Sequence, residues 1–251
     1  MKYTGRTSRN INIKALGLLL CILVASYGII KAPASDTRKL EADLRKKQQL
    51  INEEKGKKVD GTSTLPSQST SALHTAVPAD NMPADTSKEA VTKRHLVTVI
   101  GDSVFLGASV AFQQQCENAV VDAKISRQVV QALDVAKQLD KKHKLGDIVI
   151  IALGTNSNFN SKSGQKLIDY LGKDRTIYWI DTYGKHLDIQ QDVNNTIQRV
   201  VAANNNVQRI YWSKEGEKHP DWFYQDGVHL NPHGEKKYAR FIMRMIQSSL
   251  D

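Results

Sequence analysis

Short apolar runs alternate with amphipathic stretches along the C-terminal part of the chain. The apolar runs are strand candidates at residues 96–100 (LVTVI), 119–125 (AVVDAKI), 147–153 (DIVIIAL), 176–181 (TIYWID) and 207–212 (VQRIYW). The intervening and following stretches, at residues 104–115, 127–143, 162–172, 188–204 and 232–249, have helical spacing of their apolar positions. This pattern predicts an α/β fold: a three-layer α/β/α sandwich whose helices cover both faces of a mostly parallel five-stranded sheet.

The N-terminal part of the chain has a different pattern. A basic segment, residues 1–14, precedes an uncharged run that is short for a membrane span of about 17–25 residues, although flanking lysines extend such runs by snorkelling. The positive-inside rule places residues 1–14 in the cytoplasm. Residues 15–31 therefore predict a transmembrane helix, a single-pass anchor in the cell membrane with an extracellular C-terminal domain. The alternative is a signal peptide cleaved near residues 32–34, which predicts a secreted protein.

Two segments connect this anchor to the domain. Residues 32–58 are rich in strong helix formers and predict a helical stalk. Leu40, Leu44 and Ile51 have roughly heptad spacing, but Lys47 occupies the position between them, which weakens a coiled-coil interpretation. Residues 59–94 consist mainly of Ser, Thr, Ala, Pro and Asp and predict a disordered, flexible linker. The folded domain is expected at residues 95–251.

Charge and cysteine content narrow the classes of partner. The net charge is +9, yet residues 1–93 carry 15 Lys and Arg against 9 Asp and Glu, while residues 94–251 carry 20 against 17. A nucleic-acid partner would select a basic face on the folded domain, so none is expected, whereas a basic N-terminus suits a membrane surface. Cys116 is alone in the domain and is expected to be a small buried hydrophobe. The histidines lack metal-ligand spacing and no Gly-rich phosphate loop is present, so neither metal nor cofactor is predicted.

Polar residues follow the strands at the edge where parallel sheets bind ligands. Ser103 follows the first strand, Asn156 follows the third, and Asp226 and His229 lie in the loop before the last helix. A serine hydroxyl needs a base, usually a histidine that a carboxylate orients, and the oxyanion that forms needs preorganised donors. We expect His229 and Asp226 to serve Ser103, with the backbone N–H of Ser103 and the amide of Asn156 as donors. His233 is a competing base, but Pro232 places it in the first helical turn, which favours a surface position.

The motifs GDSV (residues 101–104), GTN (154–156) and DGVH (226–229), in this order, resemble the sequence blocks of the SGNH (GDSL-type) hydrolase superfamily. The segment DAKISRQ (122–128) and the motif DGVHL are more similar to the extracellular catalytic domain of Gram-positive peptidoglycan O-acetyltransferases. The resemblance covers residues 96–251. It implies Ser103 as nucleophile, His229 as base, Asp226 as its orienting carboxylate and Asn156 as oxyanion donor.

One position departs from the superfamily pattern. The second block usually contains a glycine whose backbone N–H is a further oxyanion donor, and here Ser126 stands in its place. The resemblance implies the same use of the Ser126 N–H, unless the position requires a positive φ, which serine tolerates poorly.

The resemblance implies an exported serine acyltransferase that O-acetylates a cell-wall glycan, on the muramic acid of peptidoglycan, through an acyl-Ser103 intermediate. Its relatives usually carry a large multi-span membrane domain on the same chain. With one span predicted here, a separate membrane acyltransferase is expected as acetyl donor. Two alternatives remain: an SGNH carbohydrate esterase or lipase-like hydrolase, and a non-catalytic cell-wall-binding domain. The segment HPDWFYQDG (219–227) is expected either to pack in the core or to wall the substrate groove.

Overall fold

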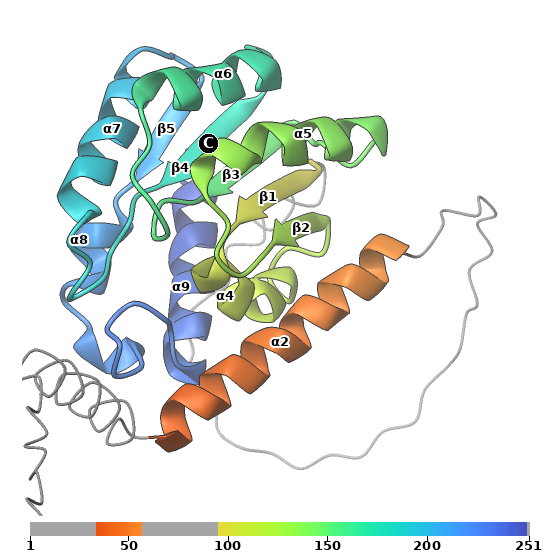
Figure 1. Cartoon of the computed structure of the whole chain (residues 1–251). Helices are drawn as coiled ribbons and strands as arrows, with labels where there is room; N and C mark the ends of the chain where they lie inside the picture. Colours follow the sequence, from red (N-terminus) through yellow and green to blue (C-terminus); the bar gives the residue numbers. More distant parts are fainter. Residues whose placement is uncertain (1–33, 57–94, 250–251) are drawn as a thin grey trace, which may run out of the picture. The chain divides into compact units, whose positions relative to one another are not determined.

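The computed structural model describes residues 34–56 and 95–249 (Figure 1). The chain divides into two units, residues 1–41 and 42–251, so that the first turns of helix α2 (Ala34–Gly56) belong to the first unit. The predicted anchor and linker lie outside the described residues and stay predictions. Within the two described ranges, we find no helix with the length and apolar character needed to cross a bilayer.

In the described part of the chain, one sheet of five parallel strands forms the centre of the domain. The strands are β1 (Val97–Gly101), β2 (Ala119–Ala123), β3 (Ile148–Ala152), β4 (Thr176–Ile180) and β5 (Val207–Ile210). Their order is β2-β1-β3-β4-β5, and all neighbouring strands pair in parallel. From β1 the chain crosses to β2 on one side, and it then returns past β1 to form β3 on the other side. Such a switch point is where open parallel sheets bind their ligands.

The register brings three chain segments together at this switch point. Gly101, the last residue of β1, pairs with Ala123 of β2 and with Ala152 of β3. All three strands end at the same level, so the residues that follow them lie side by side. These segments begin at residues 102, 124 and 153, and they carry Ser103, Ser126 and Asn156, three of the residues expected to form the site.

Helices cover both faces of the sheet (Figure 1). Helices α4 (Ser103–Gln113) and α9 (Pro232–Gln247) pack against each other on one face. Helices α5 (Ala132–Lys141), α6 (Ser161–Leu171) and α7 (Gln190–Ala202) lie along the other face, where their apolar sides form a core with the inner residues of the strands. Strands β1 and β3 are buried along their whole length, which explains their uninterrupted apolar sequences. The predicted α/β fold with a parallel five-stranded sheet is confirmed.

The structure differs from the sequence prediction at some element boundaries. The second strand ends at Ala123 rather than at residue 125, because the chain turns at Lys124–Ser126 and Ser126 adopts a φ of +58°. The predicted helix at 127–143 consists of a 3₁₀ turn, η1 (Val129–Gln131), followed by α5. Two short elements were not predicted, α8 (Trp212–Gly216) and η2 (Pro220–Trp222).

Candidate active site

Ser103 lies where β1 passes into helix α4. Asp102 caps this helix by accepting a hydrogen bond from the backbone N–H of Val104 at 3.0 Å, and its own N–H donates to the carbonyl of Ala152 in β3. Gly101 is required in the turn, because a Cβ there would approach the Cβ of Phe105 to 2.8 Å. Ser103 therefore occupies the first helical position, where a backbone N–H finds no acceptor within the helix.

The hydroxyl of Ser103 contacts His229, which is distant in the sequence. Its Oγ lies 2.9 Å from Nε2 of His229, and Nδ1 of the same ring lies 2.7 Å from Oδ2 of Asp226. An ionised carboxylate can only accept, so Nδ1 carries the proton and Nε2 is left as acceptor for the serine hydroxyl. The three residues form one hydrogen-bonded chain, the arrangement in which a histidine takes the proton of a serine nucleophile.

Asp226 is held in its ionised form. Partial burial by itself would raise its pKa, but the His229 side chain and the backbone N–H groups of Val228 and His229 donate to the carboxylate, and together they lower the pKa below the ordinary value. Both N–H groups bond to Oδ1 at 2.9 Å, which leaves Oδ2 for the imidazole. The lowered pKa means that Asp226 carries a negative charge at neutral pH, where it stabilises an imidazolium on His229.

A tight turn shapes the loop at residues 224–229, which carries Asp226 and His229 and is called the catalytic loop below. Gly227 has a φ of +67°, a conformation that glycine adopts readily, and a Cβ there would also meet the Cβ of Lys185 at 2.8 Å. The N–H of Tyr224 donates to the carbonyl of His229 and closes the loop. Asn231 then caps helix α9 by accepting from the N–H groups of His233 and Gly234. His229 is therefore fixed between a glycine turn and a helix cap.

Asp102 has a second role that sequence reasoning missed. Its Oδ2 accepts a hydrogen bond from Thr155 Oγ1 at 2.7 Å, which ties the turn before Ser103 to the segment after β3. Burial raises the pKa of Asp102, although hydrogen bonds from Thr155 and Val104 and the nearby His229 oppose that rise. The only sequence signal for this contact is the presence of Thr155 within the GTN motif.

Arg127 anchors the second sequence block. Its buried guanidinium donates to the carbonyl of Gly101 at 3.1 Å and to Oδ1 of Asp122 at 2.6 Å, and it also bonds the Asp122 carbonyl. The segment that carries Ser126 is thereby fastened to the end of β1, shortly before Ser103. The Asp122–Arg127 spacing is visible in the sequence, but nothing in the sequence shows that Arg127 also bonds the carbonyl of Gly101.

Asn156 connects the GTN motif to the second block. Its side-chain nitrogen donates to the carbonyl of Arg127 at 3.2 Å and to Thr155 Oγ1 at 3.1 Å. Ser126 lies one residue before Arg127, is exposed, and has a left-handed backbone. The position thus has the positive φ that a glycine would adopt without strain and that serine adopts at a cost. The structure places all three predicted donors, Ser103, Asn156 and Ser126, at the ends of neighbouring strands.

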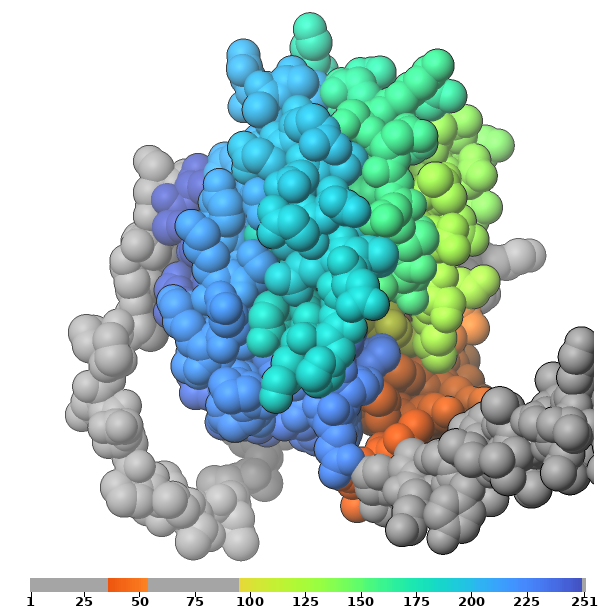
Figure 2. All heavy atoms as spheres, turned by 60° about the vertical axis from the view of Figure 1, so that its left-hand side comes forward, coloured from red at the N-terminus to blue at the C-terminus, as the bar shows by residue number. Residues whose placement is uncertain are grey.

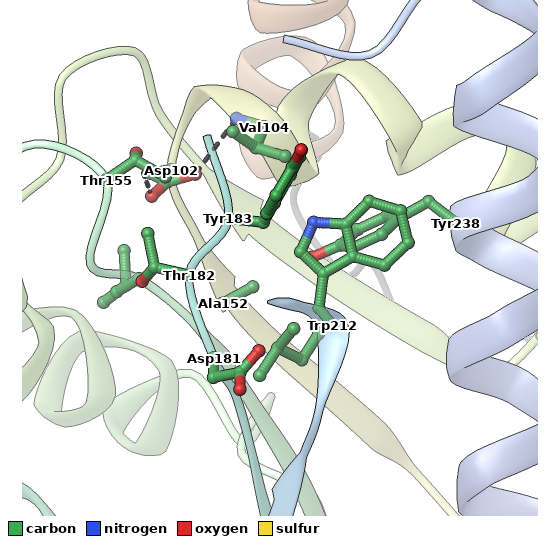
Figure 3. A pocket seen from close by; sticks show the side chains of 11 residues that line it. Asp102, Val104, Ala152, Thr155, Asp181, Thr182, Tyr183, Trp212 and Tyr238 are labelled. Carbon is green, nitrogen blue, oxygen red and sulfur yellow. Dashed lines mark hydrogen bonds between the residues drawn. The ribbon is translucent and has the colours of Figure 1, made fainter. Parts of the chain in front are cut away.

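A cavity of about 20 Å³ lies beneath the Ser103 turn, large enough for one water molecule (Figure 3). Asp102 and Thr155 lie together at one end, with Asp181 and Thr182 further along the same side, and Trp212 and Tyr238 lie on the opposite side (Figure 3). Burial raises the pKa of Tyr238 well above its usual value, and the charges of Asp102 and Asp181 raise it further. Tyr238 therefore remains a neutral hydroxyl beside two carboxylates.

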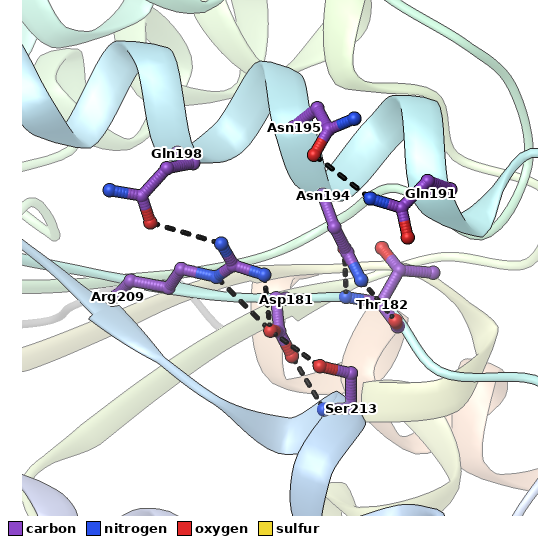
Figure 4. A network of polar contacts seen from close by, with 8 residues as sticks. All are labelled: Asp181, Thr182, Gln191, Asn194, Asn195, Gln198, Arg209 and Ser213. Carbon is purple, nitrogen blue, oxygen red and sulfur yellow. Dashed lines mark hydrogen bonds and ion pairs between the residues drawn. The ribbon is translucent and has the colours of Figure 1, made fainter.

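Asp181, at the end of β4, organises the neighbouring loop (Figure 4). Arg209 donates to Oδ2 of Asp181 through Nη2 at 2.8 Å. Ser213 donates to Oδ1 through its backbone N–H and to Oδ2 through its hydroxyl. The next residue, Thr182, exchanges two hydrogen bonds of 2.8 Å with the amide of Asn194 (Figure 4). These contacts fix the start of the loop at residues 183–187, which packs against the catalytic loop through the hydrogen bond from Lys185 N to Gly227 O.

A groove of about 250 Å³ lies beside the catalytic loop. It is lined by Tyr183, Lys185, His186, Pro220, Phe223, Tyr224, Gln225 and Gly227. Figure 2 shows the surface of the domain on the side of α7 and α8. Of the aromatic segment at 219–227, Phe223 and Tyr224 contribute to the groove. Trp222 is buried and stacks on Trp212.

Other sequence candidates lie apart from this chain of contacts. His233 is exposed in the first turn of α9, whereas His229 contacts the serine. Cys116 is buried, and burial raises the pKa of its thiol to about 11, which keeps it protonated at neutral pH. Within the two described ranges, no cluster of His, Cys, Asp and Glu side chains has the geometry of a metal site.

Comparison with known proteins gives these contacts a context. The chain is 35% identical over 166 residues to YrhL of Bacillus subtilis (strain 168), by its name a candidate peptidoglycan O-acetyltransferase. It is 31% identical over 163 residues to the O-acetyltransferase OatA of Staphylococcus aureus (strain NCTC 8325 / PS 47). The chain is a homologue of the peptidoglycan O-acetyltransferases. The matches cover 66% and 64% of this chain but only 25% and 26% of the relatives, so the chain spans about a quarter of their length.

Solved structures agree with the fold. The C-terminal catalytic domain of Streptococcus pneumoniae peptidoglycan O-acetyltransferase A matches with a TM-score of 0.56 at 23% identity, covering 62% of this chain and 94% of that domain. A lipase/acylhydrolase from Enterococcus faecalis matches with a TM-score of 0.50 at 17% identity, covering 61% and 95%. No protein-family model matches the chain. The resemblance to peptidoglycan O-acetyltransferases predicted from the sequence blocks is confirmed by these relatives.

Proposed function

We propose that the protein is an extracytoplasmic serine acyltransferase that O-acetylates a cell-wall glycan, on the muramic acid of peptidoglycan. The observation that carries this proposal is the contact chain from Asp226 through His229 to Ser103, with separations of 2.7 and 2.9 Å. The homology to named O-acetyltransferases supports acetyl as the transferred group and a glycan as its acceptor.

In the first half of the reaction, Nε2 of His229 accepts the proton of Ser103 while Oγ attacks the carbonyl carbon of an acetyl ester. The carbonyl π electrons move onto oxygen, and His229, now an imidazolium facing the charge of Asp226, returns the proton to the leaving oxygen. The product is an acetyl ester on Ser103. In the second half, a sugar hydroxyl gives its proton to His229 and attacks this ester, and the proton then returns to Oγ of Ser103.

The oxyanion of both steps needs fixed donors. We assign them to the backbone N–H of Ser103, the side-chain nitrogen of Asn156 and the backbone N–H of Ser126. In the structure both N–H groups of the Asn156 amide are bonded, to the carbonyl of Arg127 and to Thr155 Oγ1, so the oxyanion takes the place of one of these acceptors. The first lies at a helix N-terminus, where the N–H groups are unpaired and the dipole favours negative charge. The other two lie in segments that Arg127 and Thr155 fasten to the same edge of the sheet. Such preorganisation is what stabilises a developing charge.

The groove beside the catalytic loop suits a polymeric sugar acceptor. The tyrosine rings of Tyr183 and Tyr224 offer surfaces on which a sugar ring packs, and Gln225 offers hydrogen-bonding groups. Lys185 and His186 add basic groups on the same groove, which suits the acidic character of muramic acid. We place the acceptor glycan here.

The acetyl donor and the location of the protein belong to the same proposal. We place the domain outside the cell membrane, held by residues 15–31, with acetyl supplied by a separate membrane acyltransferase. Loss of wall acetylation on deletion of that donor would support this, and unchanged acetylation would remove it.

An assay with the purified full-length chain tests the proposed reaction. The chain is incubated with an artificial acetyl ester and a chito-oligosaccharide, and acetylated sugar and free acetate are quantified. We expect acetylated sugar, with at least about a 10⁴-fold loss in Ser103→Ala and no loss in Ser248→Ala, an exposed serine at the end of α9. Undiminished activity of Ser103→Ala would remove the mechanism.

The esterase alternative uses the same residues, and the fold it needs is that of the Enterococcus faecalis lipase/acylhydrolase. The two reactions differ in whether water or a sugar hydroxyl attacks the acyl-enzyme. Free acetate without acetylated sugar, across several glycan acceptors, would identify an esterase. Failure of a sulfonyl fluoride to label Ser103 would favour the non-catalytic alternative.

A further inference from the structure

Residues 42–56 of helix α2 belong to the same compact unit as the catalytic domain, although a long segment of chain separates the two (Figure 1). Leu44, Lys47 and Ile51 are buried, and their spacing places them on one side of the helix. The neighbouring residues Arg45, Lys46 and Gln49 are exposed. This helix therefore presents one side to the domain and the other to solvent.

A buried ion pair fixes the rotation of the helix. Nζ of Lys47 lies 2.7 Å from Oε1 of Glu235, and the two side chains are only 10% and 12% exposed. Glu235 lies in the first turn of α9, shortly after His229. Its Oε1 would lie 3.3 Å from a Cβ on Gly107 of α4, so glycine leaves room for the carboxylate. The helix that begins at Ser103 and the helix that follows His229 thus both meet α2 at this pair.

With this rotation, Gln48 faces the segment that follows β2. Its Oε1 accepts the backbone N–H of Ile125 at 3.3 Å, and its Nε2 donates to the backbone carbonyl of Ala123 at 3.2 Å. One side-chain amide thereby bridges the two ends of the turn immediately before Ser126. Arg127 holds the other side of the same segment through Gly101 and Asp122.

Without these contacts, the backbone of Ser126 would relax to a less strained conformation. Ser126 has a φ of +58°, in the left-handed region that residues with a Cβ atom disfavour. Its side chain is exposed, and residues on both sides of it are fastened. Strained backbone of this kind persists only where the surroundings determine it.

We propose that Gln48 is a positioning residue of the acyl-transfer site: by bridging Ala123 and Ile125 it keeps the backbone of Ser126 in the conformation that aims its N–H at the reacting acyl group. The proposal rests on the oxyanion role assigned to Ser126 above. It makes the segment before the linker a working part of the catalytic domain. A glycine in the second block needs no such support, because glycine adopts positive φ without strain.

The test is a rescue experiment on the full-length chain with an artificial acetyl ester. Gln48→Ala should lower kcat about tenfold with KM nearly unchanged, because an oxyanion donor acts mainly on the transition state and its misplacement costs part of the 10²–10³-fold effect of removal. Gln49→Ala is the matched control, an exposed neighbour of the same type, and should retain wild-type kcat. Gln48→Ala/Ser126→Gly should recover to within about threefold of Ser126→Gly alone, since glycine holds the conformation unaided.

Each result decides between two statements. A kcat of Gln48→Ala equal to that of Gln49→Ala would overturn the positioning role. A loss that persists undiminished in the double variant would also overturn it, because a general loss of packing is not relieved by a change at residue 126. Ser103→Ala, measured in parallel, reports on the proposed function separately: an active Ser103→Ala removes the acyl-transfer mechanism whatever Gln48 does.

Discussion

Replacing Lys47 by Met tests the packing of α2 on the domain. The substitution keeps the length of the aliphatic side chain but removes the charge that lies 2.7 Å from Glu235. Removing one partner of a buried ion pair costs about 3–5 kcal/mol, because the other charge is left without compensation. Asp43, whose carboxylate lies 2.5 Å from the same Nζ, also loses its partner but is 39% exposed and recovers solvation from water. We therefore expect a loss of about 3 kcal/mol at pH 8.

The loss should depend on pH in a defined direction. Burial raises the pKa of Glu235 above its ordinary value of 4.5, Lys47 opposes the rise and Asp43 adds to it. An acid whose pKa is raised on folding binds more protons folded than unfolded, so its presence lowers stability as the pH rises above the ordinary value. Without Lys47 the folded pKa rises further and this decline becomes steeper. The difference between Lys47→Met and wild type should be largest at pH 8 and shrink towards pH 5.

Urea unfolding followed by circular dichroism measures this difference. With a urea slope of about 1–3 kcal/mol per M, a loss of about 3 kcal/mol should lower the midpoint of Lys47→Met by about 1–3 M. Lys46→Met, at the exposed neighbouring position, should leave it unchanged. The double variant Lys47→Met/Glu235→Leu, which replaces the pair by apolar groups, should return to within about 1 kcal/mol of wild type. Equal midpoints for Lys47→Met and Lys46→Met would refute the burial of this pair.

Two further predictions concern the catalytic loop and the groove. Asp226→Asn should lower kcat by about 10³–10⁴-fold, because the amide no longer holds the tautomer of His229. Folding lowers the pKa of Asp226, so its contribution to stability is present above about pH 4 and is lost as the pH falls through the folded pKa. In urea unfolding, Asp226→Asn should therefore lose less stability at pH 3 than at pH 6. An equal loss at both pH values would contradict this. Tyr224→Ala should raise the KM for a glycan acceptor several-fold without changing hydrolysis of a small acetyl ester, whereas Tyr224→Phe, which keeps the ring, should not. An unchanged acceptor KM in Tyr224→Ala would place the acceptor elsewhere.

The sheet and the meeting of Ser103, Asp226 and His229 follow from local patterns. Each strand is a short apolar run, parallel strands share one edge, and the residues after them are polar, so topology alone brings distant residues together. The sequence blocks also lie at turns that their own residues stabilise, with Asp102 and Asn231 as helix caps.

The contacts that support the site join residues far apart in the sequence, and no local sequence pattern predicts these pairs. Lys47 interrupts an apolar spacing and argues against burial, until Glu235, 188 residues away, provides a compensating charge. The aromatic segment at 219–227 left core packing and a groove wall equally open, and stacking on Trp212 places Trp222 in the core. The glycine expected at the position of Ser126 raises the question of a positive φ, but only the fastened residues around Ser126 show that its φ is positive.

The most direct test of the central claim is the mass of the protein during turnover. The chain is mixed with an artificial acetyl ester, quenched in acid within the first turnovers, and analysed intact and as peptides. The account predicts one added acetyl group, located on Ser103, that disappears when a glycan acceptor is supplied and never forms in Ser103→Ala. An acetyl group located on another residue during turnover would contradict the account. Undiminished product formation by Ser103→Ala would contradict it as well.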